Sequence, residues 1–454
     1  MAVWEQTALV TALCVAGAFA VAEVIRRAVP ALSRLGLPGS ILAGCLALAA
    51  GPQWLEWLPV DQSVLELVVY HGLALVFIAV ALTPPDDRPE GEAAASGGLS
   101  MAFAIVSMVT LQTIAGVLIV LCWGLLTDAI HPGMGLLLPL GFEQGPGQAM
   151  AMGSVWEPAL QDGAQLGLII ASIGFAWSVL FGVPLVMLGR ARGWGTTADP
   201  SDAAGGVMAT ERAPAGGMDI LTAQLVAVSC VYAATLGLCH LLSLGISMLD
   251  ADIGKMVWGF HFIVGALIAT GVRPLLLRLH REPFLHAGSL RRIAGTSVDI
   301  TTASALAAVQ LAVFAEHWMP LMLLTTLGGV LTLAWVLYIA PRAFPDAPFE
   351  HALVWFGMST GTLPMGLALL RVVDPELRSP APVSAVIGSA GATLGSIPVV
   401  LVIHPAIAST WPDSFPTQAW VWTLVALAYF VVVVGLWRGL GPLRFRNVSW
   451  GRQP

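Results

Sequence analysis

Two short polar, glycine-rich stretches interrupt apolar parts of the chain and hold the side chains best suited to chemistry. Residues 141–149 read GFEQGPGQA, and residues 356–366 read FGMSTGTLPMG. Carboxyl, amide and hydroxyl oxygens are the ligands that hard cations prefer, and backbone N–H groups freed at a helix start bind anions. These residue types therefore predict a site for a cation and a small anion.

The first stretch offers one carboxyl group, two amides and three glycines. A charge at membrane depth costs ~3 kcal/mol or more, so Glu143 is expected to bind a cation such as Na⁺, to relay a proton or to pair with a cationic part of a substrate. A solvated position near the outer face is the alternative. Gln144 and Gln148 are expected either to contact a substrate or to hydrogen-bond the broken backbone. Gly145 and Gly147 allow positive φ and a close approach of the backbone to a ligand.

The second stretch offers hydroxyl groups instead. The residues expected to line a substrate site here are Ser359, Thr360, Gly361 and Thr362. Ser359 and Thr360 are also expected to bind an alkali cation through hydroxyl and carbonyl oxygens, with ordinary packing between helices as the alternative. Arg371 follows the stretch and either binds a substrate carboxylate with its bidentate fork or pairs with a nearby acid.

A third group lies in a predicted span that is otherwise uncharged. Asp299 is followed closely by Thr301 and Thr302. A carboxylate beside hydroxyl groups is a suitable Na⁺ site, which we expect these residues to share with Ser359 and Thr360. The alternative is a position near the cytoplasmic end of the span, close to two arginines.

The composition indicates which kind of protein holds these groups. Of the 454 residues, 57% are hydrophobic and 10% are charged, whereas soluble domains carry roughly 25% charged residues. We therefore expect an all-α, multi-pass membrane protein with membrane lipid and a small anionic substrate as partners, and no nucleic acid. The five cysteines fall in apolar runs without metal-ligand spacing and are expected to be small buried side chains.

Hydropathy divides the chain into two halves with the same plan. A spanning helix needs ~20 mostly apolar residues, which predicts about 11 spans: 7–24, 37–58, 67–82, 99–126, 165–188, 220–249, 256–272, 293–314, 319–339, 383–403 and 418–437. The predicted parts are an N-terminal repeat at 1–189 with a hairpin near 133–153, a cytoplasmic linker at 190–218, a C-terminal repeat at 219–405 with a hairpin near 351–373, and an extra transmembrane helix at 417–438.

Each polar stretch falls near the end of its half, between apolar arms too short to span. Broken backbone at membrane depth is tolerated only where it lines a cavity or is buried in protein. Two such interruptions at corresponding positions of two halves are typical of a transporter binding site. We therefore expect each stretch to be the tip of a re-entrant hairpin. Because five spans is an odd number, the two repeats are inverted, and the hairpins enter from opposite faces.

The basic residues predict an orientation. With the N-terminus outside and the C-terminus in the cytoplasm, every arginine falls in or beside a cytoplasmic segment and only Lys255 falls outside. This distribution follows the positive-inside rule. The first hairpin then enters from outside and the second from the cytoplasm.

The motifs resemble those of the bacterial sodium/glutamate symporters, the GltS-type family, over nearly the whole chain apart from the last apolar helix. Residues 37–44, LPGSILAG, are similar to the proline-then-glycine opening of that family's second span. Gly145-Pro146-Gly147 falls where the family carries a Gly-His-Gly tip. Residues 295–306 resemble its span before the second hairpin, and residues 356–364 resemble its second tip with a Thr-Pro.

The resemblance implies inverted repeats, a homodimer in a bacterial inner membrane, and coupling of Na⁺ entry to uptake of an acidic amino acid such as glutamate. Pro146 replaces the family histidine, and Glu143, Gln144 and Gln148 add polar groups. A proton- or sodium-coupled transporter of a dicarboxylate or hydroxycarboxylate is therefore the alternative.

A membrane-embedded sensor or an intramembrane enzyme is a further alternative, from a different class. No soluble signalling domain is recognised in the sequence. No His-Glu-x-x-His motif occurs, and the Gly-x-Ser-x-Gly spacing occurs only within the second polar stretch, at residues 357–361. We therefore expect no enzymatic activity.

Overall fold

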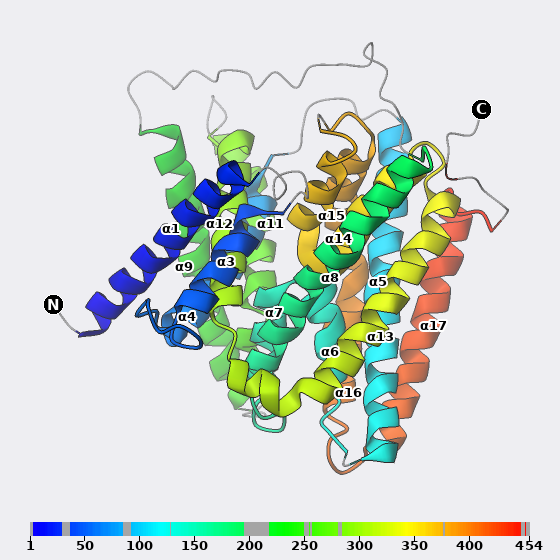
Figure 1. Cartoon of the computed structure of the whole chain (residues 1–454), viewed down its shortest axis with the longest axis horizontal. Coiled ribbons are helices and arrows are strands. Elements are labelled where there is room, and N and C mark those ends of the chain that lie inside the picture. Colours follow the sequence, from blue (N-terminus) through cyan, green and yellow to red (C-terminus); the bar gives the residue numbers. More distant parts are fainter. Residues whose placement is uncertain are drawn as a thin grey trace. The chain divides into compact units, whose positions relative to one another are not determined.

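The chain folds into helices, as the sequence predicts (Figure 1). The computed structural model describes residues 3–29, 37–84, 92–127, 129–194, 218–248, 254, 257–279, 284–375, 377–445 and 450. Within these residues there is no strand, and ten helices are long and apolar enough to cross a membrane. The expected all-α, multi-pass membrane fold is therefore confirmed.

The helices follow the two halves of the sequence. The N-terminal half contains α1 (Val3–Ala28), α3 (Gly39–Ala50), α4 (Gln62–Leu82), α5 (Glu92–Leu126), α6 (Gly133–Pro139), the π-helix η1 (Leu140–Gln144), α7 (Pro146–Trp156) and α8 (Gly163–Ala191). The C-terminal half contains α9 (Ile220–Ser247), α11 (His261–Leu279), α12 (Ala287–Ala307), α13 (Leu311–Ala343), α14 (Pro348–Arg371), α15 (Ala381–Ile397), the π-helix η3 (Pro398–Ile403), α16 (His404–Ala408) and α17 (Thr417–Leu440).

Some predicted span boundaries differ from the observed helices. The break predicted between residues 314 and 319 falls earlier, because α12 ends at Ala307 and α13 then continues past Pro320 for a total of 33 residues. A proline inside a helix clashes with the carbonyl group four residues before it. α13 accommodates Pro320 with a kink at His317, where φ is −106° and ψ is 17°. The second predicted span is also shorter, since α3 has 12 residues.

Spatial contacts divide the chain into two compact units. Unit 1 contains residues 1–19, 43–88 and 204–308, and unit 2 contains residues 20–42, 89–203 and 309–454. Both halves of the sequence therefore contribute to each unit, and both polar stretches lie in unit 2. The predicted linker at 190–218 lies mostly outside the described residues, and the division of the sequence into repeats stays a prediction.

α4 and α12 form the centre of unit 1. They approach so closely that a Cβ at Gly72 would lie 2.2 Å from Thr301 Oγ1. Ile78 and Leu82 of α4 are fully buried in a hydrophobic cluster with Leu290 of α12 and with residues of α9 and α11. A glycine on α4 therefore permits the close contact between α4 and α12.

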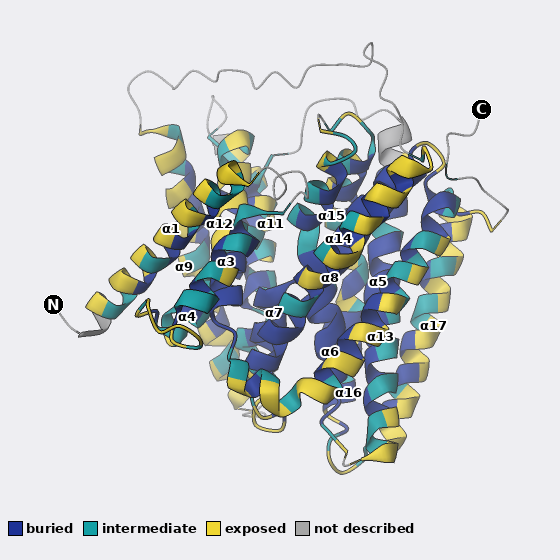
Figure 2. Ribbon diagram, viewed as in Figure 1, coloured by how far each residue is buried: buried dark blue, intermediate teal, exposed yellow. Residues whose placement is uncertain are grey.

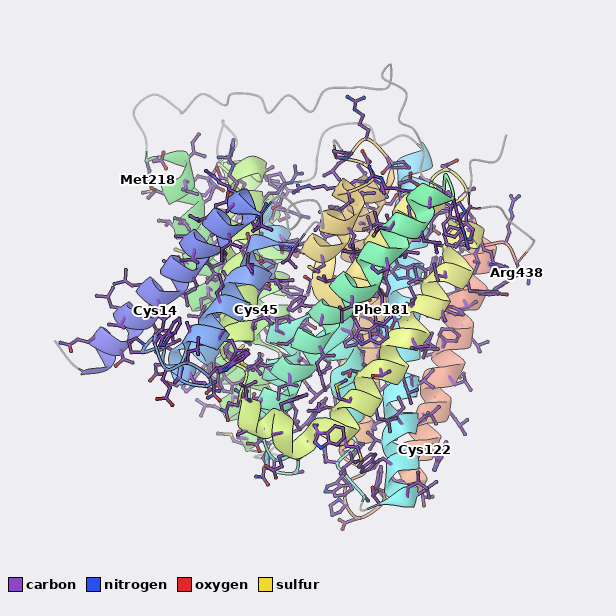
Figure 3. All side chains as sticks on the ribbon, in the orientation of Figure 1. Cys14, Cys45, Cys122, Phe181, Met218 and Arg438 are labelled. Carbon is purple, nitrogen blue, oxygen red and sulfur yellow. The ribbon has the colours of Figure 1, made fainter. Side chains whose placement is uncertain are left out.

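The cysteines are free thiols, and Figure 3 labels Cys14, Cys45 and Cys122 on α1, α3 and α5. Cys45, Cys122 and Cys230 are exposed on their helices, and Cys239 is buried. The prediction of five buried cysteines is therefore wrong for the three exposed thiols. Hydropathy cannot separate the two cases, because lipid tails are as apolar as a protein core.

Candidate functional site

Both polar stretches break their helices at a residue with unusual backbone geometry. In the first, η1 ends at Gln144, Gly145 has φ 95° and ψ 175°, and α7 begins at Pro146. In the second, α14 is interrupted at Gly361 and at Thr362, which has φ 77° and ψ 165°. Glycine adopts positive φ readily, whereas a β-branched residue is strained there. Each break also frees backbone N–H groups at the start of the next helical segment.

The chain doubles back at each break, so that each stretch is the tip of a hairpin. At the base of the first hairpin, a Cβ at Gly133 would lie 2.9 Å from Trp156 Cε3, which joins the start of α6 to the end of α7. In the second, a Cβ at Gly357 would lie 2.5 Å from Gly366 Cα across the two arms of α14. Both hairpins are almost entirely buried in protein (Figure 2). Irregular backbone at membrane depth is tolerated where it is buried in protein, as it is here.

The two ends of α8 contact the bases of the two hairpins. Gly163, its first residue, packs on Gly153 near the base of the first hairpin. Near the other end of α8, Gly189 packs on Phe349 at the base of the second. α8 has 29 residues, which corresponds to roughly 44 Å at 1.5 Å per residue. The hairpins therefore enter unit 2 from opposite ends (Figure 1).

The two tips meet beside the middle of α8. A Cβ at Gly145 in the first tip would lie 2.7 Å from Thr362 Cγ2 in the second. A Cβ at Gly174 of α8 would lie 2.4 Å from Thr360 O and 2.9 Å from Phe142 Cδ1. Residues of both tips and of α8 therefore form one site, which we call the tip site.

Gln112 of α5 connects the second tip to α13. Its side chain is fully buried, and its Nε2 donates to Ser359 O at 3.0 Å and to Thr332 Oγ1 at 2.9 Å. Thr332 Oγ1 donates in turn to Gly328 O at 2.8 Å. An amide nitrogen has two protons, so both donors of Gln112 are used to hold the second tip in place.

A pair of hydroxyl groups connects the second tip to α8. Thr360 Oγ1 donates to Phe356 O at 2.8 Å, and Ser178 Oγ lies 2.6 Å from Thr360 Oγ1. Since a hydroxyl group has only one proton, Ser178 is the donor in the second contact. Gly357 O lies 3.3 Å from Ser178 Oγ and is an alternative acceptor for the same proton.

Three buried oxygen atoms of the tip site have no hydrogen-bond partner among the described residues: Glu143 Oε2, Ser359 Oγ and Gln112 Oε1. The Ser359 hydroxyl lies near the Glu143 carboxyl group. The two groups do not meet the distance and angle requirements of a hydrogen bond. Neither ion pair found in the described chain involves Glu143. Buried polar groups without partners are rare and costly, so these oxygens fit a bound cation or proton.

The remaining predicted residues of the first tip are neighbours of Gly145 in the sequence. Gly147 and Gln148 are in the first turn of α7, and Gln148 is 2% exposed. Gln144 is the last residue of η1 and is partly exposed. The structure therefore brings the predicted residues of both tips together.

Arg371 is placed differently. It is the last residue of α14 and is exposed. At 1.5 Å per helical residue it lies roughly 13 Å along the second arm from Thr362. The structure therefore does not place Arg371 at the tip site, and its predicted contact with a substrate stays a prediction.

The predicted Na⁺ ligands fall in both units. Asp299, Thr301 and Thr302 belong to α12 in unit 1, whereas Ser359 and Thr360 belong to α14 in unit 2. Asp299 is exposed, and the two threonines of α12 are buried. A common Na⁺ site for these five residues stays a prediction.

Three residues of the tip site were not predicted from the sequence: Gln112, Ser178 and Thr332. Gln112 gave a usable signal, because an amide in an otherwise apolar span is a functional candidate. Ser178 and Thr332 gave none, since single hydroxyl groups occur throughout membrane helices.

Known proteins give no independent assignment of this site. No family model matches the chain, and no curated protein matches it significantly.

Proposed function

We propose that the chain is a secondary active transporter whose substrate and coupling ion bind at the tip site. The observation that supports this is the contact between two broken hairpins beside the middle of α8, with three unpartnered oxygens next to it. Broken helices that meet near the midplane of a membrane are typical of secondary transporters. Movement of the helices that bear the two hairpins would alternate access between the two sides of the membrane.

The proposed substrate is a small carboxylate, and the family resemblance favours glutamate or a related acidic amino acid. α7 begins at Pro146, and the second arm of α14 begins after Thr362, so two helix starts lie at the tips. Helix starts have a partial positive charge and free N–H groups, which bind carboxylates. Gln144, Gln148 and the Thr362 hydroxyl would supply further donors for orientation.

The proposed coupling ion is Na⁺, as the resemblance also implies. The Glu143 carboxyl, the Ser359 hydroxyl and Gln112 Oε1 offer oxygen ligands of the type that hard cations prefer. A cation at this place would neutralise a carboxylate that forms no ion pair within the described residues. It would also give a partner to Glu143 Oε2, which has none among the described residues.

Proton coupling is the second candidate, and the position of Glu143 favours it specifically. A proton on a buried carboxyl group removes its charge as completely as a bound cation does. The protonated group could then donate to Ser359 Oγ, which has no partner among the described side chains. Transport of a dicarboxylate or hydroxycarboxylate would be consistent with this form of coupling.

Uptake measurements separate these candidates. The purified protein would be reconstituted into liposomes and supplied with radiolabelled glutamate under an inward Na⁺ gradient, an inward proton gradient or neither. Uptake that requires the Na⁺ gradient supports the sodium symporter. Uptake that requires only the proton gradient supports the second candidate. If glutamate and a panel of dicarboxylates all fail to accumulate under either gradient, the proposed function is wrong.

The proposal also includes the assembly and orientation expected from the sequence. The protein would be a homodimer in a bacterial inner membrane, with its N-terminus outside and its C-terminus in the cytoplasm, and would catalyse no reaction. Reporter fusions at the two ends test the orientation, and the mass of the detergent-solubilised protein tests the dimer. A cytoplasmic N-terminus would reverse which hairpin opens to which side.

A further inference from the structure

A second polar cluster lies where α8 and α13 begin. Asp162 immediately precedes α8, and Glu316 and His317 are at the kink of α13. The carboxylate oxygens and an imidazole nitrogen of these side chains all lie within 4.8 Å of one another. Two acidic groups and one histidine from segments far apart in the sequence therefore share one place in unit 2.

Two side chains of this cluster lack an expected hydrogen bond within the described part of the chain. His317 Nε2 is buried and has no hydrogen-bond partner among the described residues. Asp162 is the N-cap residue of α8, yet its carboxylate accepts no bond from the helix backbone. Glu157 takes that role instead, because its Oε1 accepts from Ala164 N at 3.3 Å. An aspartate at an N-cap normally forms this bond itself, so its carboxylate here stays available to a ligand.

The backbone around the cluster is held in place by other bonds. Gln165 Oε1 accepts from Gln310 N at 3.0 Å, which ties the first turn of α8 to the start of α13. Asp162 adopts a left-handed conformation with φ 57° and ψ 25°. His317 departs from helical geometry. The positions of the three side chains thus depend on local backbone geometry and not on direct bonds between them.

We propose that Asp162, Glu316 and His317 form a binding site for a divalent transition metal ion of the Zn²⁺ type. One imidazole nitrogen and two carboxylate oxygens are a ligand set that Zn²⁺, Co²⁺ and Mn²⁺ accept, and a three-ligand site leaves a position for water. Ligand atoms about 2.1 Å from Zn²⁺ are roughly 3.4 Å apart in a tetrahedron. Separations of up to 4.8 Å would have to shorten by at most about 1.4 Å to reach that geometry, and Glu316 is exposed.

The metal site is separate from the tip site, although the same two helices contribute to both. α8 carries Ser178 and α13 carries Thr332, and both side chains bond to residues of the tip site. A metal ion at Asp162, Glu316 and His317 would brace the starts of these helices against each other. The metal site itself does not depend on the proposed transport function.

Metal binding to the full-length protein tests the proposal. The protein, purified in detergent with a tag that contains no histidine and treated with a chelator, would be titrated with Zn²⁺ in a calorimeter and with Co²⁺ in a spectrophotometer. The variants would be D162N, E316Q and H317Q. Each keeps the side-chain size or reach, and asparagine tolerates the left-handed conformation of residue 162. H240Q is the matched control, since His240 is exposed on α9 in unit 1.

We expect saturable binding of one Zn²⁺ per chain, at least tenfold weaker in each of the three variants and unchanged in the control. Zn²⁺ should also raise the midpoint of thermal unfolding, and this shift should be lost in H317Q. Co²⁺ should produce the visible absorption of a site with a nitrogen ligand. The proposal is overturned if no saturable binding occurs, or if H317Q and the control bind Zn²⁺ as the wild-type protein does.

Discussion

Gly145 and Thr362 have nearly the same backbone conformation, with φ 95° and ψ 175° at the glycine and φ 77° and ψ 165° at the threonine. They also touch, because a Cβ at Gly145 would lie 2.7 Å from Thr362 Cγ2. Each residue ends one helical arm and precedes another. The two halves of the chain therefore form the same kind of break and bring the breaks together. The positive φ is strained at Thr362, because its side chain is β-branched. Gly145 adopts a positive φ without that strain.

The substitution Gly145→Ala should damage the first tip in two ways. The added Cβ would occupy a strained backbone conformation, at a cost of order 1–3 kcal/mol, and would collide with Thr362. We expect a lower midpoint of thermal unfolding in detergent and the loss of most uptake. Gly17→Ala is the control, because the space around that helical glycine is open. Equal effects of the two substitutions would contradict the assigned role of Gly145.

The substitution Thr362→Gly should separate the effect of backbone strain at this residue from the role of its hydroxyl group. Glycine removes the strained β-branched side chain, so unfolding should need the same or a higher temperature, while the loss of the hydroxyl group should reduce uptake at least tenfold. Thr362→Val loses the hydroxyl and keeps the strain, so it should reduce uptake without any gain in stability.

In a double-mutant cycle, Thr362→Gly should recover part of the stability lost in Gly145→Ala, because it removes the collision between the two side chains. Strictly additive effects would mean that the two tips do not touch.

The substitution Glu143→Gln tests the proposed coupling. Glutamine keeps the size of the side chain and removes its charge and its exchangeable acid proton. Uptake driven by a Na⁺ or proton gradient should fall at least tenfold, while binding of the substrate, measured by calorimetry, should persist. Glu23→Gln is the control, because Glu23 is a partly exposed residue of α1, far from both tips in the sequence, that pairs with Arg27. Gradient-driven uptake at the wild-type rate in Glu143→Gln would exclude Glu143 as the coupling residue.

The substitution Gln112→Leu should loosen the second tip. It leaves Ser359 O and Thr332 Oγ1 without their donor, and a buried polar group without a partner costs ~1–3 kcal/mol. We therefore expect lower stability together with reduced uptake. Thr332→Val removes one acceptor and leaves the bond from Gln112 to Ser359 O intact, so its effect should be smaller. A larger loss in Thr332→Val than in Gln112→Leu would show that Gln112 does not position the tip.

The sequence predicted the helical fold and the two tips because their signals are strong and local. Long apolar runs identify membrane helices, and glycine, proline and Glu143 within such runs mark the breaks. The partners of the tips were not predictable, since which helix faces a tip depends on packing. Gln112 lies on α5 and Ser178 on α8, and neither position follows from hydropathy. For the same reason Asp299, an acid in an apolar span, could be read as a buried ligand although it is exposed on α12 in unit 1.

The connection that precedes the first hairpin contains a buried histidine whose titration should affect stability. His131 is 5% exposed. Its Nδ1 accepts from Gly133 N, at the start of α6, at 3.0 Å, and it also forms a hydrogen bond with the backbone of Ala408. Burial lowers the pKa of His131 to about 4, and the bond to Ala408 only partly opposes this shift. The folded protein therefore holds a neutral imidazole whose Nδ1 carries no proton.

Stability should fall as the pH drops below about 6.5, the ordinary pKa of histidine. Between that pH and about pH 4 the unfolded chain binds the proton and the folded chain does not, so each step in acidity favours unfolding. The full effect is roughly 3 kcal/mol for a shift of this size. His131→Asn keeps an oxygen acceptor for Gly133 N and cannot titrate, so its unfolding midpoint should change less between pH 7 and pH 4. The same pH dependence in wild type and in His131→Asn would assign the effect to another group.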